Sequence, residues 1–276
     1  MGTHDHGTLA SGIHRPTEVA PQPRLIHLTL EKGGRVLAVV PARGGSKGIP
    51  KKNTLLFQGR PLVAHALTHA LTSRLITDVV LSTDSKDIAR IAAEHDVAVV
   101  DRPLALAGDE VPMMPVVEHA VLKHEADAQA IVWIVVILQP TCPLREPADI
   151  DGAIQMLIDR GLDCVVSVAP SREHPVKAKR IVDGILKPYF EVEPSGGLRQ
   201  SLPLSWRRNG AVYVLRRAKG FDSDPIRSST VAPYIMPLDR SIDIDDPLDL
   251  EIAEWMASRV KAAVTSTPRD VDDSNA

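Results

Sequence analysis

Aromatic residues and cysteines are scarce in this sequence. Phe, Trp and Tyr make up 3% of its 276 residues, so the core must consist mainly of Val, Ile, Leu and Ala. The two cysteines, Cys142 and Cys164, are too few for a disulfide framework and do not have the spacing of a metal site. We therefore expect reduced thiols in a cytoplasmic protein.

Strong net charge and long apolar runs are also missing. A net charge of −3 gives no electrostatic footprint for nucleic acid. The longest apolar run, Ile131–Leu138, has the length of a strand and not of a membrane span. No apolar region of the signal-peptide type follows Met1. We expect neither a nucleic-acid partner nor a membrane partner.

A glycine-rich, cationic loop follows the first apolar run, Val36–Val40, which we interpret as a buried strand. Glycine lets backbone N–H groups approach a phosphate, and Arg and Lys neutralise its charge. The loop contains neither the P-loop pattern nor GxGxxG. It predicts a phosphate site, and the alternative is a solvated basic turn. The candidate residues are Arg43, Gly44, Gly45, Ser46, Lys47, Lys52 and Asn53.

Strand and helix patterns alternate along the rest of the chain, which predicts an α/β fold with a mainly parallel, Rossmann-like sheet. Ligands gather at the carboxyl ends of such strands, where the phosphate loop also lies. His65 and His69, four residues apart on one predicted helix, are a possible metal pair, although a solvated helix face explains them as well. The further predicted strands are 79–82, 97–100, 131–138, 164–168 and 210–215.

Paired carboxylates follow near the end of the predicted domain. Ile242 and Ile244 alternate with Asp243 and Asp245, so a strand here would bury the isoleucines and place both carboxylates on one face. Two carboxylates with phosphate nearby suit Mg²⁺, whereas turn and cap roles are the alternative. We expect Asp246 to cap the last helix. Its expected packing face is Leu248, Ile252, Trp255 and Met256.

Residues 171–206 interrupt the α/β alternation. They include a predicted hairpin about Asp183-Gly184. An insertion of this kind is typical of an arm that packs on a second subunit, and a surface insertion is the alternative. We expect a disordered extension over 1–34, one domain over 35–264 and a loose tail over 265–276.

Five segments in order resemble the acylneuraminate cytidylyltransferases, the CMP-sialic acid synthetases: VVPARGGSKGIPKKN, LQPTCPLR, REHPVKAKR, RRNGAVYV and SIDIDDPLDL. The resemblance extends from Val36 to Met256. It implies a nucleotidyltransferase that is active as a homodimer with Mg²⁺. The reaction implied is CMP transfer from CTP to a nine-carbon 2-keto sugar acid, with release of pyrophosphate.

The resemblance also implies roles for individual residues. Matching positions make Arg43, Lys52 and Asn53 nucleotide-binding, with Arg43 and Lys52 offsetting charge on the phosphates during attack. The same matching makes Asp243 and Asp245 the ligands of the metal ion, and it makes Asp243 a proton acceptor as well. The residues implied to contact the sugar are Gln139, Lys177, Arg199 and Trp206, of which Lys177 comes from the dimer partner.

Two segments depart from the family pattern. GDEVPMM lacks a Ser/Thr-rich run that many members have, which makes a legionaminate or pseudaminate acceptor an alternative to sialic acid. RRNG replaces the common RPNG and adds a cation. The rival functions are a CMP-Kdo synthetase, against which the SKGIPKKN spelling argues, and a non-catalytic nucleotide-sugar binding protein.

Overall fold

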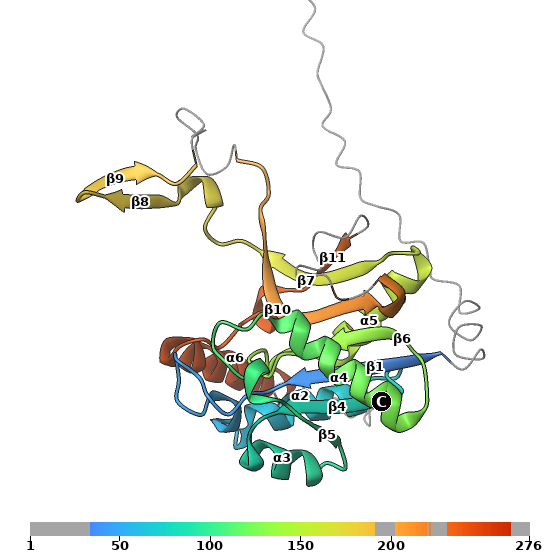
Figure 1. Cartoon of the computed structure of the whole chain (residues 1–276). Coiled ribbons are helices and arrows are strands. Elements are labelled where there is room, and N and C mark those ends of the chain that lie inside the picture. Colours follow the sequence, from blue (N-terminus) through green and yellow to red (C-terminus); the bar gives the residue numbers. More distant parts are fainter. Residues whose placement is uncertain (1–33, 191–201, 220, 222–230, 266–276) are drawn as a thin grey trace, which may run out of the picture.

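A seven-stranded sheet organises the protein. The computed structural model describes residues 34–190, 202–219, 221 and 231–265 (Figure 1). The strand order is β11-β7-β10-β6-β1-β4-β5, and every neighbouring pair is parallel except those that include β10, which runs antiparallel to β6 and β7. The strands are β1 (Arg35–Pro41), β4 (Asp78–Thr83), β5 (Ala98–Asp101), β6 (Val132–Ile137), β7 (Cys164–Pro170), β10 (Trp206–Arg216) and β11 (Val231–Ile235). The predicted α/β class and mainly parallel sheet are confirmed.

Helices cover both faces of this sheet because its central strands are apolar on both sides. In β1, Ala38 and Val40 pack with α2 (Leu62–Thr72) and α5 (Pro147–Asp159). The alternate residues Leu37 and Val39 pack with α4 (Met113–Ala128) on the opposite face. Helix α3 (Lys86–Ala93) follows β4, and two short strands, β2 (Leu56–Phe57) and β3 (Arg60–Pro61), precede α2. None of the described helices is long and apolar enough to cross a membrane.

A separate apolar cluster joins the phosphate loop to the aspartate segment. Ile49 and Phe57, from the loop and its continuation, pack with Ile242 and Ile244 and with Ala253 of α6 (Pro247–Thr265). This cluster attaches the loop to the segment that carries the paired aspartates. The two polar segments are thus held side by side by the apolar residues between them.

The expected strand at Ile242–Asp245 is absent, and that prediction is wrong. The segment is extended chain without a strand partner, and the N–H of Ile244 instead donates to the carbonyl of Thr141 (2.9 Å). The alternation of burial still holds, since Ile244 is fully buried and Asp245 is exposed. A single extended segment docked on a loop produces the same alternation as a strand, because both project successive side chains to opposite sides.

The last helix is capped as expected but packs differently. Asp246 accepts a hydrogen bond from the N–H of Asp249 (2.9 Å), and Asp249 accepts one from the N–H of Asp246 (3.1 Å). The expected packing face is only partly correct, because Leu248 and Trp255 are 62% and 58% exposed. Ala253 and Ala257 take buried positions of this helix instead.

The histidine pair of α2 points into the protein, so the predicted solvated face is wrong. His65 is buried, and its Nε2 lies 2.8 Å from the carbonyl oxygen of Phe57. Burial lowers the pKa of His69 to about 3, so this ring is neutral. Among the described residues no group of three or more His, Cys, Asp or Glu could hold a metal ion.

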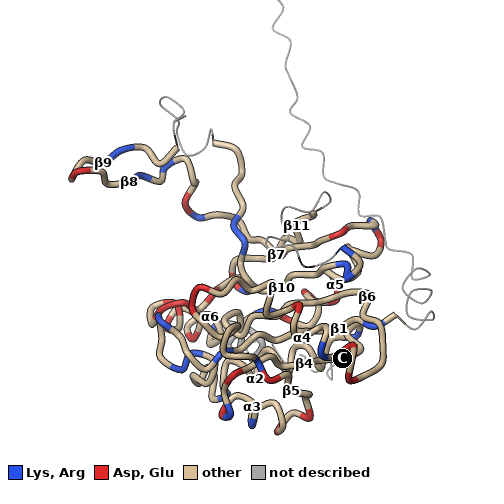
Figure 2. Tube along the Cα trace, viewed as in Figure 1, with Lys and Arg blue, Asp and Glu red and all other residues tan. Residues whose placement is uncertain are grey.

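The predicted hairpin is confirmed and stands away from the sheet. Strands β8 (Lys179–Val182) and β9 (Ile185–Pro188) pair with each other only, in a two-stranded sheet, and Figure 1 shows them projecting from the body. Asp183 and Gly184 have φ values of +53° and +74°, as a type I′ turn requires. Figure 2 shows Lys and Arg along both strands. Residues 191–201 of the predicted arm lie outside the described residues.

Candidate active site

A cleft of about 440 Å³ opens at the carboxyl edge of the parallel strands. The residues that follow β1, β5 and β6 line it, together with the segment that precedes α4 and the aspartate segment. This is the edge at which open α/β sheets bind ligands. The predicted residues that line the cleft are Arg43, Gly45, Ser46, Lys52, Asn53, Gln139, Asp243 and Asp245.

Carboxylates pair with the cations of the phosphate loop, of which Arg43 and Lys52 line the cleft and Lys47 does not. Arg43 and Lys47 form ion pairs with Asp109, the latter at 3.4 Å. Lys52, whose side chain is only 14% exposed, pairs with Asp245 at 2.9 Å. Partial desolvation opposes the effect, but the hydrogen bond and charge of Arg43 hold the pKa of Asp109 below its usual range. Carboxylate oxygens therefore contact the groups that a phosphate would be expected to contact.

Backbone contacts fix the shape of the loop. The N–H of Gly44 donates to Asp84 Oδ1 (2.8 Å), and Asn53 Nδ2 donates to the carbonyl of Arg43 (2.8 Å). A Cβ at Gly48 would lie 2.2 Å from the backbone oxygen of Asp245, so this glycine permits the close contact between loop and aspartate segment. A Cβ at Gly45 would meet nothing within 4 Å. The backbone of Gly45 therefore borders open space, as a phosphate cradle requires.

Asp243 lies deeper than Asp245. Burial, together with the charge of Asp245, raises the pKa of Asp243, while a hydrogen bond from Thr141 and the charge of Lys52 oppose that rise. The Sγ of Cys142 lies 3.7 Å from Asp243 Oδ1. An added cation in the cleft would relieve the unfavourable proximity of these two carboxylates.

Gln139 and Asp243 converge on one glycine. A Cβ at Gly210 would lie 2.7 Å from Gln139 Oε1 and 2.7 Å from Asp243 Oδ2. Gly210 has a φ of +72° and lies in the stretch of β10 where the pairing with β7 changes register. The neighbouring Asn209 is fully buried and donates to the hydroxyl of Ser241 (2.9 Å), which joins β10 to the aspartate segment. The glycine of RRNG thus leaves room, because it has no side chain, for Gln139 (the candidate sugar-contacting amide) and Asp243 (the candidate metal ligand) to lie close together.

Other predicted sugar-contacting residues lie outside this cleft. Lys177 is exposed at the base of the hairpin, and Trp206 begins β10 with 43% of its surface exposed. Neither residue lines the cleft of its own chain. Arg199 lies outside the described residues.

Sequence reasoning missed two charged residues of the cleft, Arg102 and Asp109. Arg102 is 8% exposed and donates to the hydroxyl (3.2 Å) and carbonyl (2.7 Å) of Ser82 while it lines the cleft. Its place directly after β5, at the carboxyl edge, is the signal that could have found it. Asp109 gave no comparable signal, since an aspartate in a loop is common and its ion pairs form only in the folded protein.

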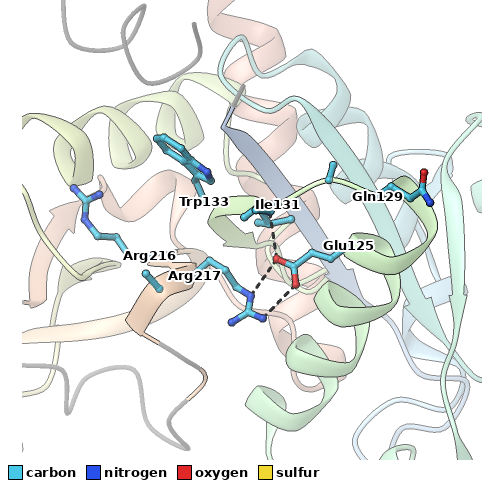
Figure 3. A pocket seen from close by; sticks show the side chains of 9 residues that line it. Glu125, Gln129, Ile131, Trp133, Arg216 and Arg217 are labelled. Carbon is cyan, nitrogen blue, oxygen red and sulfur yellow. Dashed lines mark hydrogen bonds and ion pairs between the residues drawn. The ribbon is translucent and has the colours of Figure 1, made fainter. Parts of the chain in front are cut away.

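A larger cavity of about 700 Å³ lies at the opposite edge of the sheet (Figure 3). It is bordered by the start of β6, with Trp133, and by the ends of α4 and β10. Its charged side chains are already engaged: Arg217 pairs with Glu125 at 3.2 Å, and Arg216 Nε donates to the carbonyl of Leu162 at 2.6 Å. The smaller cleft, with its cationic loop and paired carboxylates, is therefore the better candidate for chemistry.

Comparison with known proteins gives consistent matches. A family model described as cytidylyltransferase matches residues 37–187. The CMP-N,N'-diacetyllegionaminic acid synthase of Legionella pneumophila is 33% identical over 224 residues, which cover 80% of this chain and 95% of that protein. The N-acylneuraminate cytidylyltransferase of Escherichia coli is 30% identical over 79% of this chain, but the match covers only 51% of that relative.

Solved structures support the fold. A CMP:2-keto-3-deoxy-manno-octonic acid synthetase complexed with CTP superposes with a TM-score of 0.60 at 16% identity, covering 82% of this chain and all of that one. A 4-diphosphocytidyl-2C-methyl-D-erythritol synthase gives a TM-score of 0.58 at 13% identity, covering 81% of this chain and 98% of that one. At these identities the likeness concerns the arrangement of strands and helices only.

Proposed function

The chain belongs to the cytidylyltransferase family, and from this premise we propose that it transfers CMP from CTP to a nine-carbon 2-keto sugar acid with release of pyrophosphate. The observation that carries the proposal is the cleft, in which Arg43, Lys52 and an aspartate pair lie together at the carboxyl edge of the sheet. The acceptor candidates are sialic acid and a legionaminate-like acid, since relatives at similar identity carry names of both kinds.

The proposed reaction is an in-line attack by the anomeric hydroxyl of the acceptor on the α-phosphorus of CTP. The carboxylate of Asp109 pairs with Arg43 and Lys47, and that of Asp245 pairs with Lys52. The triphosphate would take over these cations, which then offset the charge that builds up as pyrophosphate leaves. The open space beside Gly45 leaves room for that exchange.

Mg²⁺ is the cofactor that this site suits, with Asp243 and Asp245 as its protein ligands. Two carboxylate oxygen donors beside a phosphate site are the set that Mg²⁺ takes, with substrate phosphate and water completing its shell. When bound, the ion would neutralise charge on the phosphates and acidify a bound hydroxyl. The raised pKa of Asp243 fits a group that needs a cation nearby and that can also accept the proton of the attacking hydroxyl.

The acceptor is proposed to bind on the Gln139 side of the cleft. The side-chain amide of Gln139 and the carboxylate of Asp243 both lie against Gly210, so an acceptor held by the amide would bring its hydroxyl close to Asp243. Lys177 lies outside the cleft of its own chain, so its proposed sugar contact is made in the cleft of a second copy.

A homodimer is therefore part of the proposal. The hairpin exposes Ile181 (75%), Ile185 (61%), Leu186 (67%) and Tyr189 (60%). A two-stranded hairpin with an apolar surface is marginally stable alone, and packing on another surface stabilises it. A second copy would cover these side chains and bring the partner's Lys177 to the cleft.

The dimer can be tested by changing the hairpin. Leu186→Lys should yield a monomer in sedimentation experiments, because it places a charge in the proposed interface, whereas Leu71→Lys, at a 49% exposed site on α2, should not. Mixing inactive Arg43→Ala with inactive Lys177→Ala should restore part of the activity, since each mixed dimer contains one complete site. A monomeric parent protein, or no rescue after subunit exchange, would contradict the proposal.

The function is tested by pyrophosphate release with a panel of nucleotides and acceptors. CTP with a nine-carbon 2-keto sugar acid should support turnover, and ATP or UTP should not. Faster turnover with the eight-carbon acid Kdo than with nine-carbon acids would favour the rival function, a CMP-Kdo synthetase, which is the activity named for one solved structure of similar fold. Tight CTP binding without turnover by any acceptor would favour a binding protein.

A cytoplasmic location is proposed on chemical grounds. Both cysteines are free and buried, and a reducing compartment keeps thiols in that state. Recovery of the native protein from an extracytoplasmic fraction after cell fractionation would contradict this.

A further inference from the structure

Arg145, at the end of LQPTCPLR, is the most deeply buried cation of the described chain. Its side chain is 1% exposed, and it has no salt bridge to a carboxylate among the described residues. Burial lowers its pKa to about 10, and the carboxylates of Asp243 and Asp149 favour its charge. It is therefore still charged at neutral pH. A buried cation of this kind is unfavourable for folding, so its presence calls for a reason other than stability.

The hydrogen bonds of Arg145 show what it holds. Its Nη1 donates to the carbonyl of Gln139 (2.7 Å) and to the carbonyl of Ala211 (2.9 Å). Its Nε and Nη2 are buried with no partner among the described residues. Two carbonyl oxygens directed at one point repel each other unless a donor lies between them, and a cationic donor is the strongest available. Arg145 thus joins the loop after β6 to β10.

That junction lies directly behind the candidate acceptor site. Gln139 supplies the side chain that would hold the acceptor, and Ala211 follows Gly210, against which both the Gln139 amide and the Asp243 carboxylate lie. If the loop moved away from β10, the amide of Gln139 would lose its position relative to Asp243. The phosphate loop, on the other side of the cleft, has no hydrogen bond to Arg145 in the described part of the chain.

We propose that Arg145 is a positioning residue for the acceptor: by holding the backbone of Gln139 against that of Ala211, it sets the place of the Gln139 amide relative to Asp243. This inference rests on the proposed function for its kinetic consequence. It predicts that Arg145 acts on acceptor binding and not on CTP binding. A residue with a merely structural role would weaken both together.

The kinetic test compares Arg145→Lys with Gln139→Ala. Lysine keeps the charge, but its side chain is one bond shorter than that of arginine, so its Nζ does not reach the position from which Nη1 donates to both carbonyls. Arg145→Lys should raise KM for the sugar acid about tenfold, equivalent to about 1.4 kcal/mol, while the Kd for CTP measured by calorimetry stays within about twofold. In the Gln139→Ala background, Arg145→Lys should have no further effect on KM, because the side chain it positions is gone. Additive effects on KM would overturn the proposal.

A structural readout tests the inference independently of activity. Hydrogen exchange in Arg145→Lys and Arg145→Met should accelerate in residues 139–145 and 209–213, with no change in β4. As a control, Arg240→Lys disturbs another guanidinium near α5, which pairs with Asp149 at 2.8 Å, and should lower stability without this local exchange pattern. Unchanged exchange in both segments would overturn the inference. An inactive wild-type protein would refute the proposed function, and the exchange result would still decide the role of Arg145.

Discussion

Replacing Gly210 by alanine tests the crowded centre of the candidate site. The added Cβ would lie 2.7 Å from both Asp243 Oδ2 and Gln139 Oε1 and 3.2 Å from Cys142 Sγ, in a backbone conformation with φ of +72°. A left-handed φ costs an L-residue about 1–2 kcal/mol. The close oxygens are the ends of the Asp243 and Gln139 side chains, so the added methyl group displaces them at little further cost in stability. We therefore expect Gly210→Ala to lower the free energy of unfolding by about 1–2 kcal/mol and to reduce turnover.

Gly161→Ala is the matched control for this change. Gly161 has a φ of +61°, but a Cβ added there would meet no heavy atom within 4 Å, so its substitution carries the backbone strain without the collision. Denaturant unfolding should give similar losses of about 1–2 kcal/mol in the two variants, because both carry the same backbone strain. Turnover should fall only in Gly210→Ala, because only there does the methyl group displace the Asp243 and Gln139 side chains. Equal turnover in the two variants would refute the convergence of Asp243 and Gln139 on Gly210.

Four further substitutions test the two sides of the cleft and the helix cap beside it. Gly45→Ala places a methyl group in open space, so it should leave the free energy of unfolding unchanged but weaken CTP binding measured by calorimetry. Unchanged CTP affinity would show that Gly45 does not form part of the phosphate site. Arg43→Ala should reduce kcat by an amount equivalent to about 2–4 kcal/mol of transition-state stabilisation, and near-normal kcat in a folded protein would be contrary to the mechanism. Burial raises the pKa of Asp243, so the ionised carboxylate destabilises the folded state. This loss of stability grows as the pH rises from the usual carboxyl range to the raised pKa of Asp243. Asp243→Asn should therefore keep or raise Tm at pH 7 while abolishing Mg²⁺-dependent turnover, whereas Asp246→Asn should be nearly silent because Asn also caps helices.

The sequence predicted the central strands and the phosphate loop because both have strong local signals. The apolar runs that became β1 and β6 are β-branched and bounded by loop residues, and glycines with cations leave few alternatives at a strand end. The hairpin at Asp183-Gly184 was equally predictable from the sequence, because few dipeptides fit a two-residue turn. The Asp246 cap was predictable for the same reason: its chemistry is local.

Features that depend on tertiary contacts were not predictable from local patterns. Alternation at Ile242–Asp245 indicated a strand, but the partner of that backbone is the loop carbonyl of Thr141. The direction of β10, antiparallel among parallel neighbours, has no sequence signature of its own. The ion pairs of Asp109 and the hydrogen bonds from Arg145 to the carbonyls of Gln139 and Ala211 form only when segments distant in the sequence meet.

The most direct test of the central claim follows the α-phosphate of CTP. The wild-type protein should be incubated with Mg²⁺, CTP labelled at the α-phosphorus and a nine-carbon 2-keto sugar acid, and the products identified by mass spectrometry. The account predicts that the label appears in a CMP–sugar acid conjugate, with one pyrophosphate released for each conjugate formed, and that Arg43→Ala and Asp243→Asn lose this transfer. Label recovered only as CTP or free CMP, or full transfer by both variants, would contradict it.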